Sequence, residues 1–227
     1  MPSKAARLSA GCLLLWVVSA AFLQQGIFES GVLIISHSGT VIGREEFVVR
    51  AGRASGDRGL TVASRVSYPA DHPRVSLVPL LELRPDSQPA SIQIDLLDGT
   101  ARRVFAELAP RRVSIRTVDG SHESVRQYPA PDRVLFLDDS AFALHAIPPQ
   151  GPAGPALMLW PRSGRRELGS WSDRGVEPTE VNGKNTLLHH IVLAGAAPRD
   201  LWYDEHGHLA KVEIPSLGLT AVRSAEH

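Results

Sequence analysis

The sequence predicts an all-β protein, mainly antiparallel, in which a meander of strands curves into a barrel or half-barrel with one short helix near residues 138–147. Three observations lead to this prediction. Apolar residues recur at every second position far more often than with the 3.6-residue period of a helix. Turn dipeptides that contain glycine separate many of these runs, and a single segment favours a helix. Strands joined by tight turns pair with their neighbours, so a long meander has to curl or close to limit its exposed edges.

The clearest alternation lies in residues 60–68. One face of this strand is predicted to carry Leu60, Val62, Ser64, Val66 and Tyr68, and the other face Thr61, Arg65 and Ser67. Residues 91–96 and 113–116 alternate in the same way. Each segment therefore reads as an antiparallel strand with one side on a core.

Several dipeptides are predicted to form two-residue hairpin turns, because Gly, Asn and Asp tolerate the positive φ angles that such turns need. They are Ser38-Gly39, Asp98-Gly99, Asp119-Gly120, Asn182-Gly183 and His206-Gly207.

Residues 137–147 are the segment that favours a helix, because Asp138 or Asp139 can cap its first turn and Pro148-Pro149 ends it. The proline- and glycine-rich stretch at 148–155 is predicted to be an internal crossover. The C-terminal part of the chain, after residue 155, is too small to form a separate core without a disulfide or a metal. We therefore expect a single antiparallel β domain over residues 22–227.

Residues 1–21 are predicted to be a signal peptide. Lys4 and Arg7 precede an apolar run, and the small residues Ser19-Ala20-Ala21 suit signal peptidase. The apolar run at 8–23 is shorter than the ~20 residues of a membrane-spanning helix, which favours cleavage over a retained anchor. We expect an exported bacterial protein, periplasmic or extracellular, that contacts the membrane only through this segment.

The composition excludes several classes of protein. The chain has 24 basic and 24 acidic residues, so no general positive field favours nucleic acid. Cys12 is the only cysteine and lies within the predicted signal peptide. The mature chain would then hold neither a disulfide nor a thiolate metal site.

Histidine and carboxylate clusters offer only weak signs of chemistry. His189 and His190 would point to opposite faces of a strand, and His206 and His208 flank a turn, so no metal ligand is assigned. Asp138 and His145 would lie two turns apart on a helix, too far for a direct hydrogen bond. The chain has no Gly-x-Ser-x-Gly, Gly-x-Gly-x-x-Gly or His-Glu-x-x-His motif. No catalytic residue and no cofactor are predicted.

A curved sheet of this length can enclose a cavity that is lined by the inward side chains of its strands. The candidate lining residues are Phe47, Val62, Tyr68, Ile94, Phe105, Ile115, Trp171 and Trp202. The alternative is that the same side chains fill a closed core.

Three blocks of sequence resemble a pattern in uncharacterised exported bacterial β-rich proteins. They are GTVIGREEF at 39–47, LDDS at 137–140, and LWYD at 201–204 followed by Gly207 and Leu209. The resemblance implies a cell-envelope protein with a curved antiparallel sheet. It extends more distantly to the half-barrel carriers that move lipoproteins or lipids across the periplasm, and it implies no catalytic residue.

The expected function is non-catalytic binding of an apolar or amphipathic molecule of the cell envelope, such as a lipid. One alternative is a structural or protein-interaction module, which would need a contiguous exposed apolar patch. Another is an envelope hydrolase that uses His145 or His206 with a nearby aspartate. The sequence does not indicate an oligomeric state.

Overall fold

A computed structural model describes residues 26–53, 58–99 and 101–225 of the chain, so the predicted signal peptide and Cys12 lie outside the described residues. The strands are β1 (Ile27–His37), β2 (Thr40–Ala51), β3 (Leu60–Tyr68), β4 (Val75–Leu83), β5 (Pro89–Leu97), β6 (Ala101–Ala109), β7 (Arg112–Asp119), β8 (His122–Pro129), β9 (Val134–Phe136), β10 (Gly154–Trp160), β11 (Arg165–Val181), β12 (Lys184–Ala194), β13 (Arg199–Tyr203), β14 (Leu209–Ile214) and β15 (Leu219–Arg223). Two 3₁₀ helices are η1 (Ala143–His145) and η2 (Pro215–Leu217). Among the described residues, no helix is long and apolar enough to cross a lipid bilayer.

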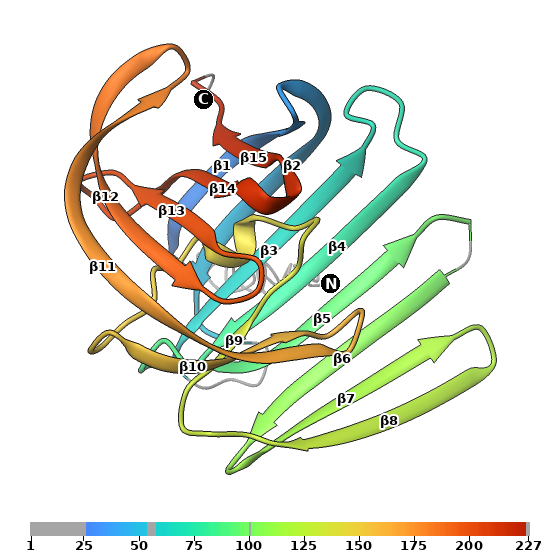
Figure 1. Ribbon diagram of the computed structural model, residues 1–227. Helices are drawn as coiled ribbons and strands as arrows, with labels where there is room; N and C mark the ends of the chain where they lie inside the picture. Colours follow the sequence, from blue (N-terminus) through green and yellow to red (C-terminus); the bar gives the residue numbers. More distant parts are fainter. Residues whose placement is uncertain (1–25, 54–57, 100, 226–227) are drawn as a thin grey trace, which may run out of the picture.

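All these strands belong to one curved 15-stranded sheet, which confirms the predicted all-β fold in its half-barrel form. The order is β8-β7-β6-β5-β4-β3-β2-β1-β15-β14-β13-β12-β11-β10-β9. Two meanders thus meet where β1 pairs with β15, and all pairs are antiparallel except β9 with β10. The sheet stays open, because its end strands β8 and β9 do not pair with each other. In Figure 1, β1 to β8 form a broad wall and the later strands curl over it.

The predicted alternation and hairpin turns are both present. In β3, Val62, Ser64 and Val66 are buried while Arg65 is exposed. The five predicted turn dipeptides each connect two consecutive antiparallel strands. Positive φ angles occur at Asn182 (52°) and Gly183 (73°), the conformation in which glycine and asparagine are least strained.

Residues 130–149, which we call the interior segment, fill the concave side of the sheet. The segment is drawn in yellow in Figure 1 and lies between the wall and the later strands. It contributes Phe136, Leu137, Phe142 and Leu144 to a buried core that also draws on strands from both meanders. The half-barrel is therefore filled by its own chain where the interior segment packs.

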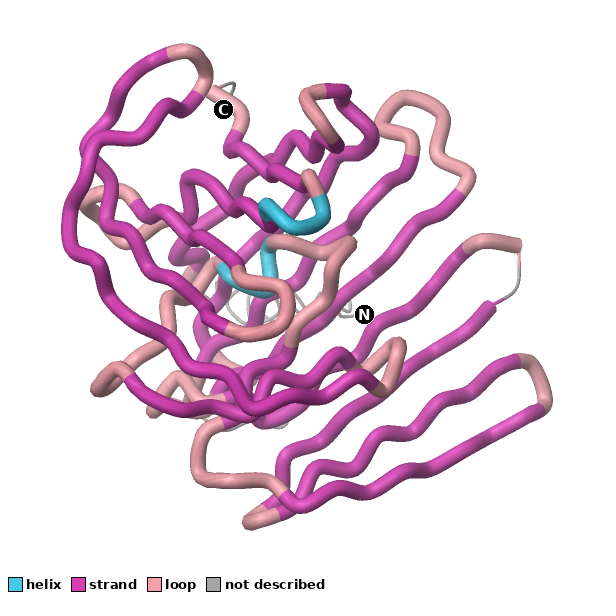
Figure 2. Tube along the Cα trace, in the orientation of Figure 1, coloured by secondary structure: helices cyan, strands magenta, loops and turns pink. Residues whose placement is uncertain are grey.

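The predicted helix over 137–147 is reduced to the single 3₁₀ turn η1, seen as a short cyan piece in Figure 2. Backbone groups that would form hydrogen bonds within a helix instead bond to side chains from distant strands. Glu45 Oε2 accepts hydrogen bonds from the backbone N–H groups of Phe142 (2.6 Å) and Ala143 (3.1 Å). The Tyr68 hydroxyl donates to the Ser140 carbonyl at 2.8 Å. Helix propensity was overridden by contacts from distant strands.

Candidate functional site

A groove of about 770 Å³ opens where the interior segment leaves the core. We call it the arm groove. Its walls come from three separate parts of the chain: the end of the interior segment, the strands β11 and β12, and the turn between β13 and β14. The lining residues are Pro148, Pro149, Gln150, Gly151, Trp171, Asp173, Val176, Leu187, His189, Ile191, Tyr203, Asp204, Glu205, His206 and Gly207.

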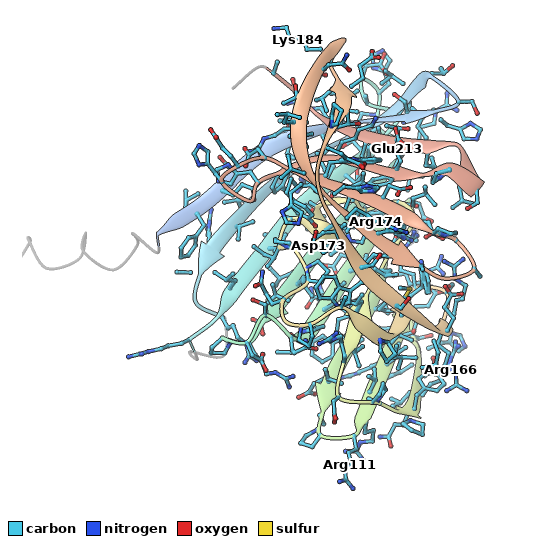
Figure 3. The ribbon with its side chains drawn as sticks, turned by 60° about the vertical axis from the view of Figure 1, so that its left-hand side comes forward. Arg111, Arg166, Asp173, Arg174, Lys184 and Glu213 are labelled. Atoms are coloured by element: carbon cyan, nitrogen blue, oxygen red, sulfur yellow. The ribbon has the colours of Figure 1, made fainter. Side chains whose placement is uncertain are left out.

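The groove exists because the β11–β12 hairpin is much longer than its neighbour β13. Strand β13 pairs only with His189–Leu193 of β12, so residues 184–188 pair with β11 alone. This part of the hairpin, residues 175–188, extends beyond the pairing with β13 and is called the arm. In Figure 3 it runs across the front of the molecule, with Asp173 and Arg174 near its base and Lys184 at its tip.

One face of the β11–β12 hairpin is held against the rest of the sheet, both at the base of the arm and at its tip. The His190 ring stacks on Trp202 with 4.7 Å between ring centroids, and its Nε2 lies 2.8 Å from Asp200 Oδ1. At the tip, Lys211 Nζ donates to the Glu180 carbonyl (3.2 Å) and Asn182 Nδ2 donates to the Arg223 carbonyl (2.9 Å). These contacts tie the arm to β13, β14 and β15.

The other face of the arm supplies an apolar surface to the groove. Val176 and Leu187 are 66% and 68% exposed, although a free apolar side chain of this size gains about 1.5–3 kcal/mol on full burial. Both line the same groove, next to the buried side chains of Ile191 and Trp171. A ligand that covers Val176 and Leu187 would therefore gain hydrophobic free energy.

Asp173 and His189 form a polar pair beside this apolar surface. Asp173 Oδ1 accepts a hydrogen bond from the Gly175 backbone N–H (2.7 Å) and lies 2.7 Å from His189 Nε2. The Gly175 N–H, and after it His189, hold the pKa of Asp173 below its usual range. The carboxylate is therefore ionised at neutral pH.

The turn between β13 and β14 forms the opposite rim. Asp204 Oδ1 accepts hydrogen bonds from the backbone N–H groups of His206 (2.9 Å) and His208 (2.8 Å), which fixes the shape of the turn. Glu205 projects into solvent, with its carboxylate 3.7 Å from His206 Nε2.

Two aromatic side chains close the inner end of the groove. The Tyr203 hydroxyl donates to the His145 carbonyl at 2.8 Å, so Tyr203 is bound to the interior segment. Trp171 is 5% exposed, and its indole N–H has no hydrogen-bond partner among the described residues. Trp171 is thus a fluorophore at the boundary between groove and core.

The Asp138 and His145 pair, considered above for acid–base chemistry, serves instead in a buried network. Arg162 donates to both carboxylate oxygens of Asp138, at 2.6 and 2.8 Å. His145 Nε2 lies 3.3 Å from Arg199 Nη1. Arg199 Nη1 also donates a hydrogen bond to the Asp138 carbonyl, at 3.1 Å. Burial, and then the Arg199 charge, lower the pKa of His145 well below its ordinary value, so the ring is neutral.

Most of the predicted cavity-lining residues lie in the packed core. Phe47, Val62, Ile94, Ile115 and Trp171 belong to the buried cluster, and Tyr68 packs against it. Trp171 is the one among them that also lines the arm groove.

Phe105 and Trp202 lie outside this core, because both point away from the concave side of the sheet. Phe105 lies between Val104 and Ala106, which are buried in the core, and it lines a separate depression of about 570 Å³ with Arg103. Trp202 stands on the face of β13 opposite to the core residues Leu201 and Tyr203, beneath His190. In both strands apolar residues occupy both faces, so alternation did not identify the inner one.

The histidines behave as the strand prediction requires. His189 and His190 point to opposite faces, toward Asp173 and Asp200 respectively. Within residues 26–53, 58–99 and 101–225, no group of three or more His, Cys, Asp or Glu side chains is placed to hold a metal ion.

Sequence reasoning missed Val176, Leu187 and Asp173 as site residues. The length of the segment 165–194 was the available signal for these residues. Its two strands are longer than the neighbouring strand β13, so, within the described part of the chain, part of the hairpin has no partner strand on that side. Comparison of the chain with protein-family models, with curated proteins and with solved structures finds no match.

Proposed function

We propose that this chain is an exported, non-catalytic binding protein that holds an apolar or amphipathic molecule of the cell envelope in the arm groove. The observation that carries the proposal is the pair of exposed apolar side chains, Val176 and Leu187, in a groove of about 770 Å³. Ligand pockets of small molecules typically measure about 300–1,000 Å³ and are lined mainly by apolar side chains with a few polar groups.

The site differs from the lumen that the sequence suggested. The interior segment occupies the concave side of the sheet, and its buried residues pack against the strands of both meanders. The open space lies at the end of that segment, where Pro148 and Pro149 face the arm. A bound molecule would rest on the arm rather than inside the half-barrel.

None of the described residues that line the groove is Ser, Thr, Cys or Lys, so the Asp173 and His189 pair has no hydroxyl, thiol or amine nucleophile of these types beside it. Binding without chemistry fits this wall better than acyl transfer does.

Titration with N-phenyl-1-naphthylamine, a neutral apolar dye that fluoresces when it leaves water, tests the proposal. We expect saturable binding to the wild-type protein and at least tenfold weaker binding to Val176→Asp, because the charge would stand on the apolar surface. Val125→Asp is the matched control, since Val125 is also an exposed strand valine (57%) but lies on β8, outside the groove.

The control variant should bind the dye as the wild type does, and the Trp171→Phe variant should lose any change in tryptophan emission on binding. Absence of saturable binding to the wild type, or equal binding to Val176→Asp, would overturn the proposal. Circular dichroism of each variant checks that the fold is retained.

A further inference from the structure

The charged side chains that line the arm groove are acidic. Asp173 stands on β11 at the base of the arm, and Asp204 and Glu205 stand on the opposite turn. The two histidines of the wall, His189 and His206, are the other titratable side chains there apart from Tyr203, and the wall contains no Arg or Lys. The groove thus combines the apolar surface formed by Val176 and Leu187 with three acidic side chains.

The Asp173 carboxylate has capacity for another donor. Its hydrogen bond from Gly175 and its contact with His189 both fall on Oδ1. Among the described residues, no partner meets Oδ2. Asp173 lines the same groove as the exposed Val176. A ligand whose cationic group binds Oδ2 could therefore lay its apolar part over Val176.

Glu205 adds a second accessible carboxylate across the groove. Its side chain is 87% exposed, and its Oε1 lies 3.7 Å from His206 Nε2. Asp204 contributes charge but is committed to its own turn through two backbone N–H groups.

Three basic residues of neighbouring segments lie outside the groove lining. Arg133 lies against the Trp171 ring (5.8 Å to the centroid) and donates to the Pro152 carbonyl at 2.6 Å. Arg174 follows Asp173 in sequence but does not line the groove, and Lys184 stands at the far tip of the arm (Figure 3). None of these side chains forms part of the groove wall.

We infer that the ligand of the arm groove is a cationic amphiphile, with an ammonium-type head between Asp173 and Glu205 and an apolar chain over Val176 and Leu187. This inference rests on the proposed function and specifies its ligand class. Charge complementarity at such a rim mainly selects among ligands, while burial of apolar surface supplies most of the affinity.

Three dodecyl compounds that share one tail and differ in head charge test the inference. They are dodecyltrimethylammonium, dodecyl maltoside and dodecyl sulfate, each used below its micelle concentration to displace N-phenyl-1-naphthylamine. At low ionic strength we expect the cation to bind about fivefold more tightly than the neutral compound, the effect of an exposed ion pair of ~1 kcal/mol. The anion should bind weakest, and 0.5 M NaCl should reduce the differences.

Asp173→Asn and Glu205→Gln should each reduce the preference for the cation and leave binding of dodecyl maltoside unchanged. Asp71→Asn is the control, because Asp71 is an exposed carboxylate in the loop between β3 and β4, outside the groove. Equal binding of all three compounds, with dye binding intact, would overturn the cation inference alone. Failure of every compound and of the dye would overturn the proposed function itself.

Discussion

Glu45 and Phe142, 97 residues apart in the sequence, are joined by a hydrogen bond of 2.6 Å from the Phe142 backbone N–H to a fully buried carboxylate. Ser64 donates to the second oxygen of the same carboxylate at 2.7 Å. The bond fixes the interior segment to strands β2 and β3. The buried carboxylate thus accepts three hydrogen bonds, and none of the three donors is a cationic side chain.

This arrangement predicts a pH-dependent stability. Burial raises the pKa of Glu45 from its ordinary 4.5 to about 7, against the lowering effect of its hydrogen bonds. Below pH 4.5 the side chain is protonated in both folded and unfolded protein. Between pH 4.5 and 7 the unfolded chain loses its proton first, so the contribution of Glu45 to the free energy of unfolding falls as pH rises, by on the order of 3 kcal/mol.

Glu45→Gln should remove this dependence, because the amide does not ionise and Ser64 can accept a hydrogen bond from it. Urea unfolding of both proteins from pH 4.5 to 8 measures the difference in free energy of unfolding. We expect that difference to favour the variant progressively as pH rises to 7. A difference that stays constant across this range would contradict the prediction, and Glu46→Gln, at an exposed neighbouring site, supplies the baseline.

Arg199 is a second buried charge, and its removal is predicted to be costly. The side chain is fully buried and donates to the Asp139 carboxylate and the Asp138 carbonyl. Arg199→Met should lower the free energy of unfolding by up to about 3–5 kcal/mol, because it removes a fully buried guanidinium that donates to the Asp138 carbonyl and is one of two arginines that contact the partly exposed Asp139 carboxylate. Arg103→Met, which breaks an exposed pair with Asp95, should cost at most ~1 kcal/mol in the same urea experiment.

The double variant Arg199→Met with Asp139→Asn distinguishes lost charge compensation from lost packing. Part of the stability should return, since the amide at 139 no longer carries the charge that Arg199 compensated together with Arg165. If the two substitutions were simply additive, the charge pair would not be the cause of the loss.

Gly43 is the glycine of β2, and its replacement by a larger residue is predicted to be costly. A Cβ atom at this position would lie 2.4 Å from Cε1 of Tyr68 and 3.0 Å from the Ser67 carbonyl oxygen. Gly43→Ala should therefore displace the Tyr68 ring and weaken its hydrogen bond to Ser140, at a cost of about 1–3 kcal/mol. Gly26→Ala, where nothing lies within 4 Å, should be nearly neutral by thermal unfolding. Equal stability of the two variants would contradict the packing argument.

The parts of the fold that could be predicted from sequence are those fixed by local physics. A turn such as Asn182-Gly183 depends on the φ angles of two residues, and the alternation in β3 depends on neighbours two positions apart. Residues 137–147 show the opposite case. Their backbone partners, Glu45 and Tyr68, belong to strands about 70 to 100 residues earlier, so local helix propensity carried no information about them.

The arm groove could not be predicted for the same reason. Its wall joins the interior segment at Pro148, the arm at Val176 and the turn at Glu205, which lie far apart in sequence. Alternation also fails where both faces of a strand are apolar, because it separates two faces without identifying the buried one. Leu201, Trp202 and Tyr203 form such a run, and so do Val104 and Phe105.

The placement of Phe105 on the outer face can be checked by stability alone. Ile115 on the adjacent strand β7 is buried in the core, so Ile115→Ala should lower the free energy of unfolding by about 2–5 kcal/mol. Phe105 is half-buried and lies outside that core. Phe105→Ala should therefore lower the free energy of unfolding by clearly less than the 3–5 kcal/mol typical of a core phenylalanine. This is expected although the Phe105 side chain is larger than that of Ile115. Urea unfolding of the two variants at one pH gives the comparison. A loss at Phe105 that equals or exceeds the loss at Ile115 would place the Phe105 ring in the core and contradict the orientation of β6.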